Sequence, residues 1–258
     1  MDIEELYSAS SKKMKASKIR ELMKYSSMPG IISFGGGSPD PENFPFDDVK
    51  DIINKWDYKK SRVAMQYGTT GGYAPLVDLI NARMKINKRM DISDDDIVVT
   101  TGGQQGLFLV SMVFLDPGDV VLVEEPTFIG AMAAFLSCGA DPVSVKLEEN
   151  GVCPDDLEAK IKSVRAQGKT IKFFYTIPYF QNPKGSTMSL EKRKAVYEIA
   201  AKHKILIVED DPYGDLYYEG TPDDYMPIKS LGSKADIVYL GSFSKVLCPG
   251  FRLGWVLG

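Results

Sequence analysis

Residues 205–213 read Ile-Leu-Ile-Val-Glu-Asp-Asp-Pro-Tyr, an apolar run that ends in three consecutive carboxylates. A short apolar run of this kind is typical of a strand that is buried on both faces of a parallel sheet. A buried carboxylate at the end of such a strand needs a charged or hydrogen-bonding partner, whereas a solvated turn needs none. The stretch therefore predicts either a functional carboxylate at a sheet edge or an ordinary polar turn.

Strand-like and helix-like segments alternate on both sides of this stretch. Apolar runs predict strands at 97–101, 120–124, 142–147, 171–176, 205–209 and 237–240. Helical patterns lie between them at 104–115, 128–137, 154–167 and 189–202. Because such alternation indicates crossover connections, we expect an α/β fold with a mostly parallel sheet and helices on both of its faces.

The residues before this core predict helices and a glycine-rich loop. An amphipathic helix is expected up to about Pro29, with Ile19, Leu22 and Met23 on one face. A short strand is expected at 31–34, running into a glycine-rich loop at 35–37, and helices at 46–58 and 73–85. We find no internal repeat or linker, so we expect an N-terminal helical arm over 1–30 and one domain over 31–258.

Composition and charge exclude several classes of partner. The 258-residue chain has a net charge of −4, and its basic cluster from Lys12 to Arg20 is mixed with acids and apolar residues at helical spacing. We therefore expect a solvated helix face there and no nucleic-acid partner. No apolar run approaches the ~20 residues that span a bilayer, and the N-terminus lacks a basic start before an apolar core. We expect no membrane association and a cytoplasmic protein.

Cysteine and histidine usage excludes several kinds of site. Cys138, Cys153 and Cys248 are an odd number of cysteines without CxxC spacing, which favours buried thiols over a disulfide framework or a zinc site. His203 is the only histidine, which excludes a Ser-His-Asp triad and any multi-histidine metal site. Its place between two lysines at a helix end favours a structural role, and we expect no metal site.

Ligands of an open parallel sheet bind beyond the carboxyl ends of its strands, so each strand-to-helix connection is informative. The stretch around Gly103 and Gln104 opens a helix whose free backbone N–H groups suit a phosphate, although a simple helix start explains it equally well. Phe128 follows the next strand and could cover a flat ligand or belong to the core. Asn182, held extended by Pro183, could hydrogen-bond a ligand or serve a turn.

The last connection follows the strand at 237–240 and carries Lys245, whose amine can act as a nucleophile if its pKa is lowered or a carbonyl is bound. Ser242, Ser244 and Arg252 give this lysine a phosphate-binding neighbourhood. From these residues alone, a solvated loop is the alternative. Taken together, the connections describe a ligand with a phosphate, a flat ring, a ring nitrogen and an aldehyde, which is pyridoxal phosphate.

Five motifs occur in one order along the chain: Thr-x-Gly-Gly-Gln-Gln-Gly, Glu-Glu-Pro-Thr-Phe, Phe-Gln-Asn-Pro-x-Gly-x-Thr-Met-Ser, Glu-Asp-Asp-Pro-Tyr and Gly-Ser-Phe-Ser-Lys-x-x-x-Pro-Gly-x-Arg-x-Gly-Trp. From about Ile31 to its last residue the chain resembles the fold-type I pyridoxal-phosphate enzymes. Within them it resembles the class I aminotransferases related to 2-aminoadipate/kynurenine aminotransferases and to the aminotransferase domain of MocR-type regulators.

The resemblance implies a role for each residue that contacts the ring. Lys245 matches the lysine that bonds to the cofactor's aldehyde and later carries a proton between the substrate α-carbon and atom C4′. Asp210 matches the carboxylate that keeps the pyridine nitrogen protonated. Tyr213 and Asn182 match the two groups that hydrogen-bond the ring's O3′ atom. Phe128 stands where family members usually stack a tyrosine, so the ring is kept and only a hydroxyl is lost.

The resemblance also implies a phosphate cup, a substrate side and a partner. Gly103 and Gln104 match the phosphate-binding helix start, and the cup is completed by Ser242, Ser244 and Arg252. Tyr67 matches a tyrosine that reaches the neighbouring subunit's phosphate, which implies a homodimer with composite active sites. Gly36 and Gly37 match the loop on the substrate side, which Asn182 also faces.

The implied activity is an aminotransferase of amino-acid metabolism that interconverts an α-amino acid and its 2-oxo acid, with glutamate and 2-oxoglutarate as one pair. Family members continue into a small C-terminal domain with the arginine that binds the substrate α-carboxylate. Because the sequence stops just as a strand pattern at 252–257 finishes, we expect it to be a fragment that lacks this domain.

Three alternatives to an active aminotransferase remain on the sequence alone, and one of them is that this chain is only a dimerising or non-catalytic module. A β-lyase or a decarboxylase could use the same fold and the same cofactor-binding residues. The ligand-sensing domain of a MocR-type regulator is disfavoured, because only about thirty residues precede Ile31 and a winged helix needs more.

Overall fold

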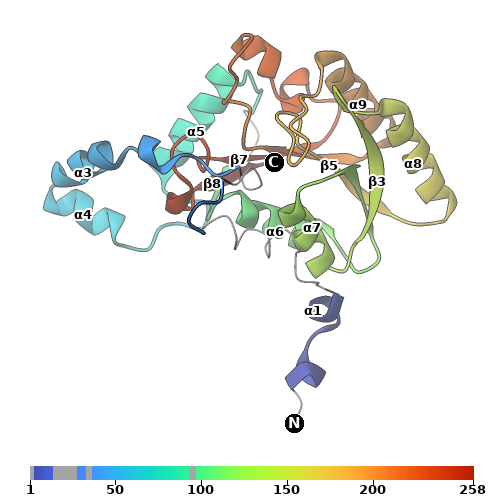
Figure 1. Ribbon diagram of the computed structural model, residues 1–258, viewed down its shortest axis with the longest axis horizontal. Helices are drawn as coiled ribbons and strands as arrows, with labels where there is room; N and C mark the ends of the chain where they lie inside the picture. The colour runs from blue at the N-terminus through green and yellow to red at the C-terminus, as the bar shows by residue number, and fades with distance from the viewer. Residues whose placement is uncertain (1–2, 14–27, 33–36, 93–96) are drawn as a thin grey trace.

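The computed structural model describes residues 3–13, 28–32, 37–92 and 97–258. Among these residues, eight strands form one sheet in the order β1-β8-β7-β6-β5-β2-β3-β4, which runs through the centre of the molecule (Figure 1). The strands are β1 (Ile97–Thr100), β2 (Val120–Glu125), β3 (Asp141–Glu148), β4 (Gly151–Val152), β5 (Ile171–Thr176), β6 (Leu206–Asp211), β7 (Ile237–Ser242) and β8 (Gly254–Leu257).

Helices cover both faces of this sheet. The α-helices are α1 (Ala9–Lys13), α3 (Phe46–Asn54), α4 (Tyr58–Ala64), α5 (Ala74–Asn87), α6 (Gly103–Phe114), α7 (Ile129–Ser137), α8 (Pro154–Ala166) and α9 (Leu190–His203). Short 3-10 turns are η1 (Ile3–Leu6), η2 (Pro41–Asn43), η3 (Pro222–Tyr225), η4 (Ile228–Leu231) and η5 (Pro249–Phe251). Within the described part of the chain, no helix combines the length and apolarity needed to cross a bilayer.

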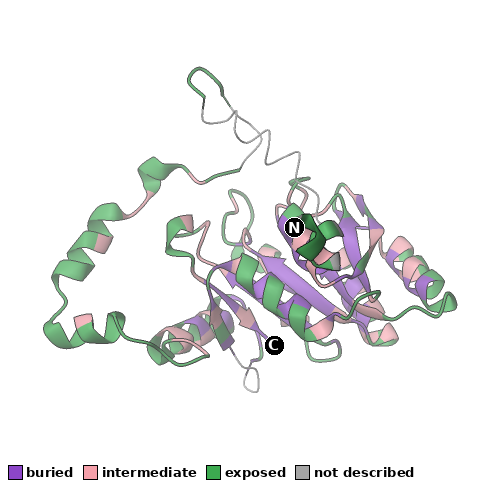
Figure 2. Ribbon diagram, turned by 90° about the horizontal axis from the view of Figure 1, so that it is seen from below, coloured by how far each residue is buried: buried purple, intermediate pink, exposed green. Residues whose placement is uncertain are grey.

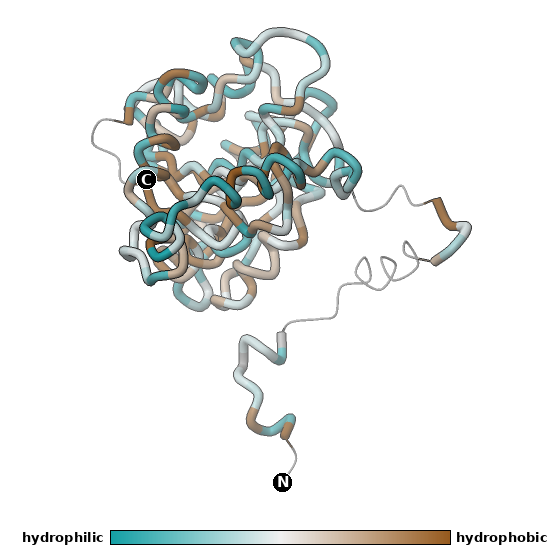
Figure 3. Tube along the Cα trace, turned by 90° about the vertical axis from the view of Figure 1, so that its left-hand side faces the viewer, coloured by the Kyte–Doolittle hydropathy of each residue, from teal (hydrophilic) through white to brown (hydrophobic). Residues whose placement is uncertain are grey.

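The alternation of side chains along β7 assigns the helices to their faces. Val238 and Leu240 join the buried cluster under α6 and α7, whereas Ile237 joins the cluster under α8 and α9. Tyr239 points to the same side as Ile237 and packs with Ile80 of α5. The α/β architecture expected from the sequence is therefore confirmed. Figure 3 shows apolar and polar segments alternating along the chain.

Strand direction places six strand ends at one edge of the sheet. β2, β5, β6 and β7 pair in parallel. β1 and β7 are both antiparallel to β8, which lies between them, so β1 runs in the same direction as β7. The carboxyl ends of these five strands, together with that of β3, which pairs in parallel with β2, therefore meet at one edge. The segments containing residues 101, 126, 177, 212 and 243 begin there.

Several sequence-based expectations need correction. The helix expected over 46–58 is interrupted, because Asp57 caps a new helix by accepting a hydrogen bond from the Lys60 N–H (2.7 Å). Strand β8 is antiparallel to both neighbours, and β3 continues into a short antiparallel partner, β4, that the sequence did not predict. Ile31 and Ile32, half of an expected strand, have no strand structure.

Part of the predicted N-terminal arm can be located. Its described residues form η1 and α1, whereas Ile19, Leu22 and Met23 lie outside the described residues. The remaining elements fall within about two residues of their expected bounds, as is usual for helix and strand ends. Ser189 caps α9 as its position before the helix suggests, since its side chain accepts a hydrogen bond from the Lys192 N–H.

Helices α3 and α4 project away from the sheet and contain no buried residue (Figures 1 and 2). Several apolar side chains of this projection are more than half exposed: Phe46, Ile52, Ile53, Tyr58 and Val63. Large apolar side chains exposed on two neighbouring helices favour an interaction surface there.

Candidate active site

The connection after β1 and the connection after β7 form an anion-binding cradle. Gly102 has φ +77°, and a Cβ atom there would lie 2.6 Å from an Arg252 guanidinium nitrogen, so the glycine lets the guanidinium lie against the backbone. Helix α6 begins at the next residue, Gly103, whose N–H group has no partner inside the helix. Beside it, the Ser242 hydroxyl lies 2.9 Å from the Ser244 hydroxyl.

Arg252 brings a positive charge to this cradle. Its guanidinium donates long hydrogen bonds to the carbonyl oxygens of Thr101 (3.4 Å) and Pro249 (3.3 Å). Among the described residues, no carboxylate forms an ion pair with it. A helix N-terminus, two hydroxyl groups and an uncompensated guanidinium together favour a phosphate dianion.

Asp210 supplies a buried carboxylate beside the cradle. The residue is 7% exposed, and one carboxylate oxygen accepts a hydrogen bond of 2.7 Å from the Tyr175 hydroxyl. Burial is the largest of the effects that raise the pKa of Asp210 to about 7; the nearby Asp211 adds to the rise, and the hydrogen bond from Tyr175 opposes it. No cation among the described residues pairs with it, so this carboxylate is ready for a cationic ligand atom.

Lys245, Tyr213 and Asn182 converge from three different connections. The Asn182 side-chain amide donates to the Tyr213 hydroxyl (3.2 Å), and the Lys245 ammonium nitrogen lies 5.9 Å from the centre of the Tyr213 ring. The same nitrogen lies 3.5 Å from the Gly37 carbonyl oxygen. Burial lowers the pKa of Lys245, which increases the fraction of neutral, nucleophilic amine.

Phe128 and Gln104 lie where α6 and α7 approach each other. The Gln104 side-chain amide donates to the Gly130 carbonyl oxygen (2.9 Å), and the half-buried Phe128 ring packs over Gly130 and against the cluster under α6 and α7. Phe128 therefore contributes to the core. Its half-buried ring also remains a candidate for covering a ligand.

The structure does not bring every predicted residue to this group. Tyr67 is 98% exposed on the segment that follows α4. Gly36 lies outside the described residues, whereas its neighbour Gly37 reaches Lys245. In one chain, therefore, Tyr67 does not join the other predicted site residues.

The sequence did not predict two buried residues that hold the site. Tyr175 lies in an apolar strand and gives no sign of its bond to Asp210, which is 35 positions away. Glu124, the last residue but one of β2, accepts hydrogen bonds from the Thr176 hydroxyl, from the Ile177 N–H (3.3 Å) and from the Gln181 amide (3.1 Å). It therefore ties the connection that carries Asn182 to the neighbouring strand. Its place at the end of an apolar run was the available signal.

The family model described as "Aminotransferase class I and II" matches residues 29–258. The chain belongs to the class I and II aminotransferase family. Aromatic-amino-acid aminotransferase 1 of Thermococcus litoralis is 42% identical over 99% of this chain. The alignment covers 61% of that relative.

Solved structures of aminotransferases share the fold. The kynurenine aminotransferase of Pyrococcus horikoshii, crystallised in complex with PMP, superposes with a TM-score of 0.93 at 41% identity, over 100% of this chain and 63% of the other. The α-aminoadipate aminotransferase LysN of Thermus thermophilus, complexed with N-(5'-phosphopyridoxyl)-L-leucine, superposes with a TM-score of 0.86 at 35% identity. The match covers 100% of this chain and 62% of the other. The chain thus spans less than two thirds of each of these proteins.

Proposed function

We propose that the protein containing this chain is a pyridoxal-phosphate-dependent aminotransferase that moves an amino group between an α-amino acid and a 2-oxo acid. The observation that carries the proposal is the meeting, at one sheet edge, of a nucleophilic lysine, a buried unpaired carboxylate and an anion cradle. We further propose that residues 31–258 form its cofactor-binding domain and 1–30 an N-terminal arm, and that the protein works in the cytoplasm.

The described residues fit this cofactor part by part. A Cβ atom at Gly102 would meet the Arg252 guanidinium, so a glycine there keeps this cation close to the N-terminus of α6, which suits the phosphate. The buried Asp210 carboxylate, which no described cation neutralises, suits a protonated ring nitrogen. The Tyr213 hydroxyl and Asn182 amide suit the ring hydroxyl, and the Lys245 amine suits the aldehyde. When bound, pyridoxal phosphate supplies an electron sink for the substrate α-carbon.

The chain's own residues then have distinct tasks. Arg252 and the Gly103 N–H hold the phosphate, so the ring keeps one position throughout the reaction. Asp210, shielded from water, maintains the positive charge of the ring nitrogen. With the cofactor bound, the Lys245 amine nitrogen would take up a proton from the substrate α-carbon and later donate it again, and a lowered pKa keeps more of this amine neutral and able to accept the proton.

We propose glutamate and 2-oxoglutarate as one substrate pair and a homodimer as the active assembly. The relatives named above are aminotransferases for aromatic amino acids, kynurenine and α-aminoadipate. In the dimer, the exposed Tyr67 of one subunit would contact the phosphate bound to the other. Its 98% exposure in the single chain is consistent with this role.

Visible absorbance of the whole protein tests the cofactor assignment. With pyridoxal phosphate present, the wild-type protein should show the absorbance of cofactor bonded to a lysine, and Lys245→Ala should lose it. Lys59→Ala, which changes an exposed lysine of α4, is the matched control and should retain it. An unchanged band in Lys245→Ala would refute the role of Lys245.

Turnover with and without a 2-oxo acid tests the reaction class. An aminotransferase consumes an amino acid repeatedly only when a 2-oxo acid accepts the amino group. A β-lyase or a decarboxylase needs no acceptor. Sustained turnover of an amino acid without added 2-oxo acid would overturn the aminotransferase assignment while leaving the cofactor assignment intact.

A further inference from the structure

Lys88, the residue that follows α5, is a buried lysine outside the group of residues assigned above. It is 4% exposed, although it stands at a helix end where lysines usually reach water. A buried ammonium is retained only where carboxylates or carbonyl groups compensate its charge. Its partners therefore indicate what it does.

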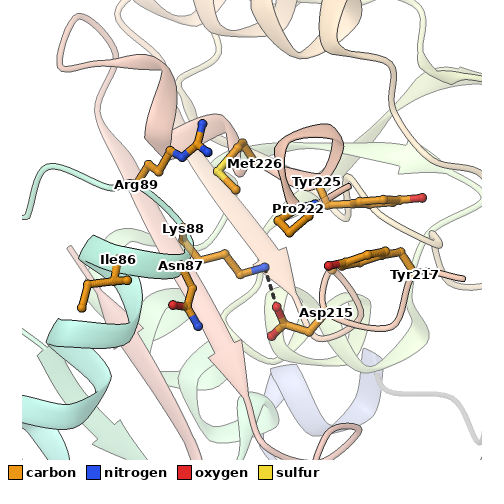
Figure 4. A pocket seen from close by; sticks show the side chains of 10 residues that line it. Ile86, Asn87, Lys88, Arg89, Asp215, Tyr217, Pro222, Tyr225 and Met226 are labelled. Atoms are coloured by element: carbon orange, nitrogen blue, oxygen red, sulfur yellow. Dashed lines mark ion pairs between the residues drawn. The ribbon is translucent and has the colours of Figure 1, made fainter. Parts of the chain in front are cut away.

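The Lys88 ammonium bridges two carboxylates on the turn that carries Tyr213. Its nitrogen lies 3.0 Å from an Asp215 carboxylate oxygen and 3.6 Å from an Asp211 carboxylate oxygen. These two residues stand two positions before and two positions after Tyr213. Figure 4 shows the Lys88 side chain extended toward Asp215.

Asp211 connects this bridge to the backbone of the turn. One of its carboxylate oxygens accepts a hydrogen bond of 2.8 Å from the Gly214 N–H, and the other accepts one of 2.9 Å from the Tyr239 hydroxyl. A Cβ atom at Gly214 would collide with this carboxylate, so Gly214 permits the close approach. The residue next to Tyr213 is therefore held by a carboxylate that Lys88 neutralises.

No other described cation can replace Lys88 at Asp211. Arg83 pairs with Asp215 at 2.7 Å, but no ion pair of the described residues joins it to Asp211. Burial lowers the pKa of Lys88, yet the two carboxylates outweigh this effect and the pKa lies above its ordinary value. Removing the ammonium would leave the Asp211 side chain, 1% exposed, without a counter-charge.

We propose that Lys88 is a positioning residue for Tyr213, because its ammonium joins Asp211 to Asp215 and so fixes the turn between them. This turn holds the Tyr213 hydroxyl against the Asn182 amide, and it holds the Tyr213 ring beside Lys245. The part of this inference that concerns catalysis rests on the proposed function. The part that concerns the turn does not.

A cavity of about 300 Å³ adjoins this bridge and makes a chemical test possible. It is lined by Lys88, Arg89, Gly214 and Asp215 and by Tyr217 and Tyr225, whose rings stack at 4.6 Å (Figure 4). In Lys88→Ala, the space vacated by the side chain would join this cavity. A small alkylammonium ion such as ethylammonium could then reach Asp211 and Asp215.

Hydrogen–deuterium exchange of the cofactor-free protein tests the turn. We expect the Gly214 amide to exchange at least tenfold faster in Lys88→Met, which keeps the length and removes the charge, while α8 and α9 keep their protection. Lys85→Met, an exposed lysine of the same helix, should leave Gly214 unchanged. Unchanged exchange at Gly214 in Lys88→Met would overturn the proposal. If that variant fails to fold, Asp215→Asn, whose side chain is partly exposed, serves in its place.

A double-mutant cycle on the whole protein tests the link to Tyr213. Lys88→Met should weaken pyridoxal phosphate binding and lower kcat by about tenfold to hundredfold, as loss of a supporting residue typically does. In the Tyr213→Phe background the same change should add little, because the hydroxyl it positions is already absent. Equal losses in both backgrounds would refute positioning through Tyr213.

Ethylammonium should restore binding in Lys88→Ala and have no effect on Lys85→Ala. Failure of this rescue at concentrations that the wild-type protein tolerates would also count against the proposal. Should the wild-type protein bind no pyridoxal phosphate, the proposed function fails, whereas the exchange of Gly214 still decides whether Lys88 holds the turn.

Discussion

At the scale of single residues, the Tyr175 hydroxyl sets the charge state of Asp210. Burial raises the pKa of Asp210 to about 7, and the hydrogen bond from Tyr175 opposes that rise. We expect Tyr175→Phe to raise this pKa further, so more of the carboxyl is neutral at pH 7 and cannot pair with a cationic ring nitrogen. A lost hydrogen bond to a charged group corresponds to about tenfold or more in affinity. Equilibrium titration of the whole protein with pyridoxal phosphate measures the loss.

The pH dependence of that loss distinguishes a charge effect from general damage. The deficit should shrink above pH 8, where the carboxyl ionises in either protein, and grow toward pH 6. Tyr197→Phe is the matched control, because its buried hydroxyl accepts a hydrogen bond from the Lys234 N–H (2.7 Å) under α9. A deficit that is the same at pH 6 and pH 9, or one shared by Tyr197→Phe, would contradict the explanation.

The residues that the sequence predicted are those that end an apolar strand or follow one. Asp210 stands out because a carboxylate at the end of a buried run is unusual, and Lys245 lies in the connection five positions after the apolar run at 237–240. Lys88 and Tyr175 could not be predicted. A lysine at a helix end has the pattern of a solvated residue, and its partners Asp211 and Asp215 are more than a hundred positions away. Only the folded chain brings them together.

At the scale of elements, Glu209 fastens η4 to β6. Its two carboxylate oxygens accept hydrogen bonds from the N–H groups of Ile228 (2.7 Å) and Lys229 (2.9 Å). Burial nevertheless raises the pKa of Glu209 from 4.5 to about 7. Between these values the folded protein keeps a proton that the unfolded chain has released. The stability that this proton provides is therefore present below pH 4.5 and is lost as the pH rises toward 7.

Urea unfolding of the cofactor-free protein checks this behaviour. Glu209 alone should lower the free energy of unfolding by about 1.4 kcal/mol per pH unit across that window. Glu209→Gln, whose side chain resembles the protonated acid, should remove the part of this pH dependence of the free energy of unfolding that Glu209 causes. Glu219→Gln, at an exposed position, should leave the pH dependence unchanged. If Glu209→Gln leaves the slope unchanged, Glu209 does not take up a proton on folding.

The positions of helices and strands could be predicted where they depend on a local sequence pattern. Features that depend on the pairing of distant strands could not. Alternating apolar runs located nearly every strand of the parallel core. The direction of β8 could not be predicted, because its pairing with β1 and β7 joins residues distant in sequence. The interruption before Tyr58 had a local signal, since Asp57 is a typical helix-capping residue.

At the scale of the whole molecule, variants of Tyr67 test whether each active site is built from one subunit or from two. If two subunits share each site, Tyr67→Ala and Lys245→Ala damage different halves of it. Each variant alone should be impaired. A mixed dimer of the two should recover one intact site, with roughly half of the wild-type activity per dimer.

Co-expression with two different affinity tags isolates the mixed dimer, and aminotransferase turnover measures its recovery. The matched control is a dimer of two Lys245→Ala subunits, one with each affinity tag, and it should stay inactive. A mixed dimer that is no more active than the Tyr67→Ala protein would mean that each chain completes its own site, contrary to the proposed assembly.

The position of β8 between β1 and β7 has a consequence for protein synthesis. Among the described residues, β1 hydrogen-bonds within the sheet only to β8, which is made about 150 residues later. While the chain emerges from the ribosome, β2, β3, β5, β6 and β7 can pair as they appear, but β1 must wait. The anion cradle needs the segment after β1 and also Arg252. A nascent chain therefore acquires its phosphate site only after residues 254–257 have left the exit tunnel. The first binding of cofactor would then show that β8 has paired with β1 and β7.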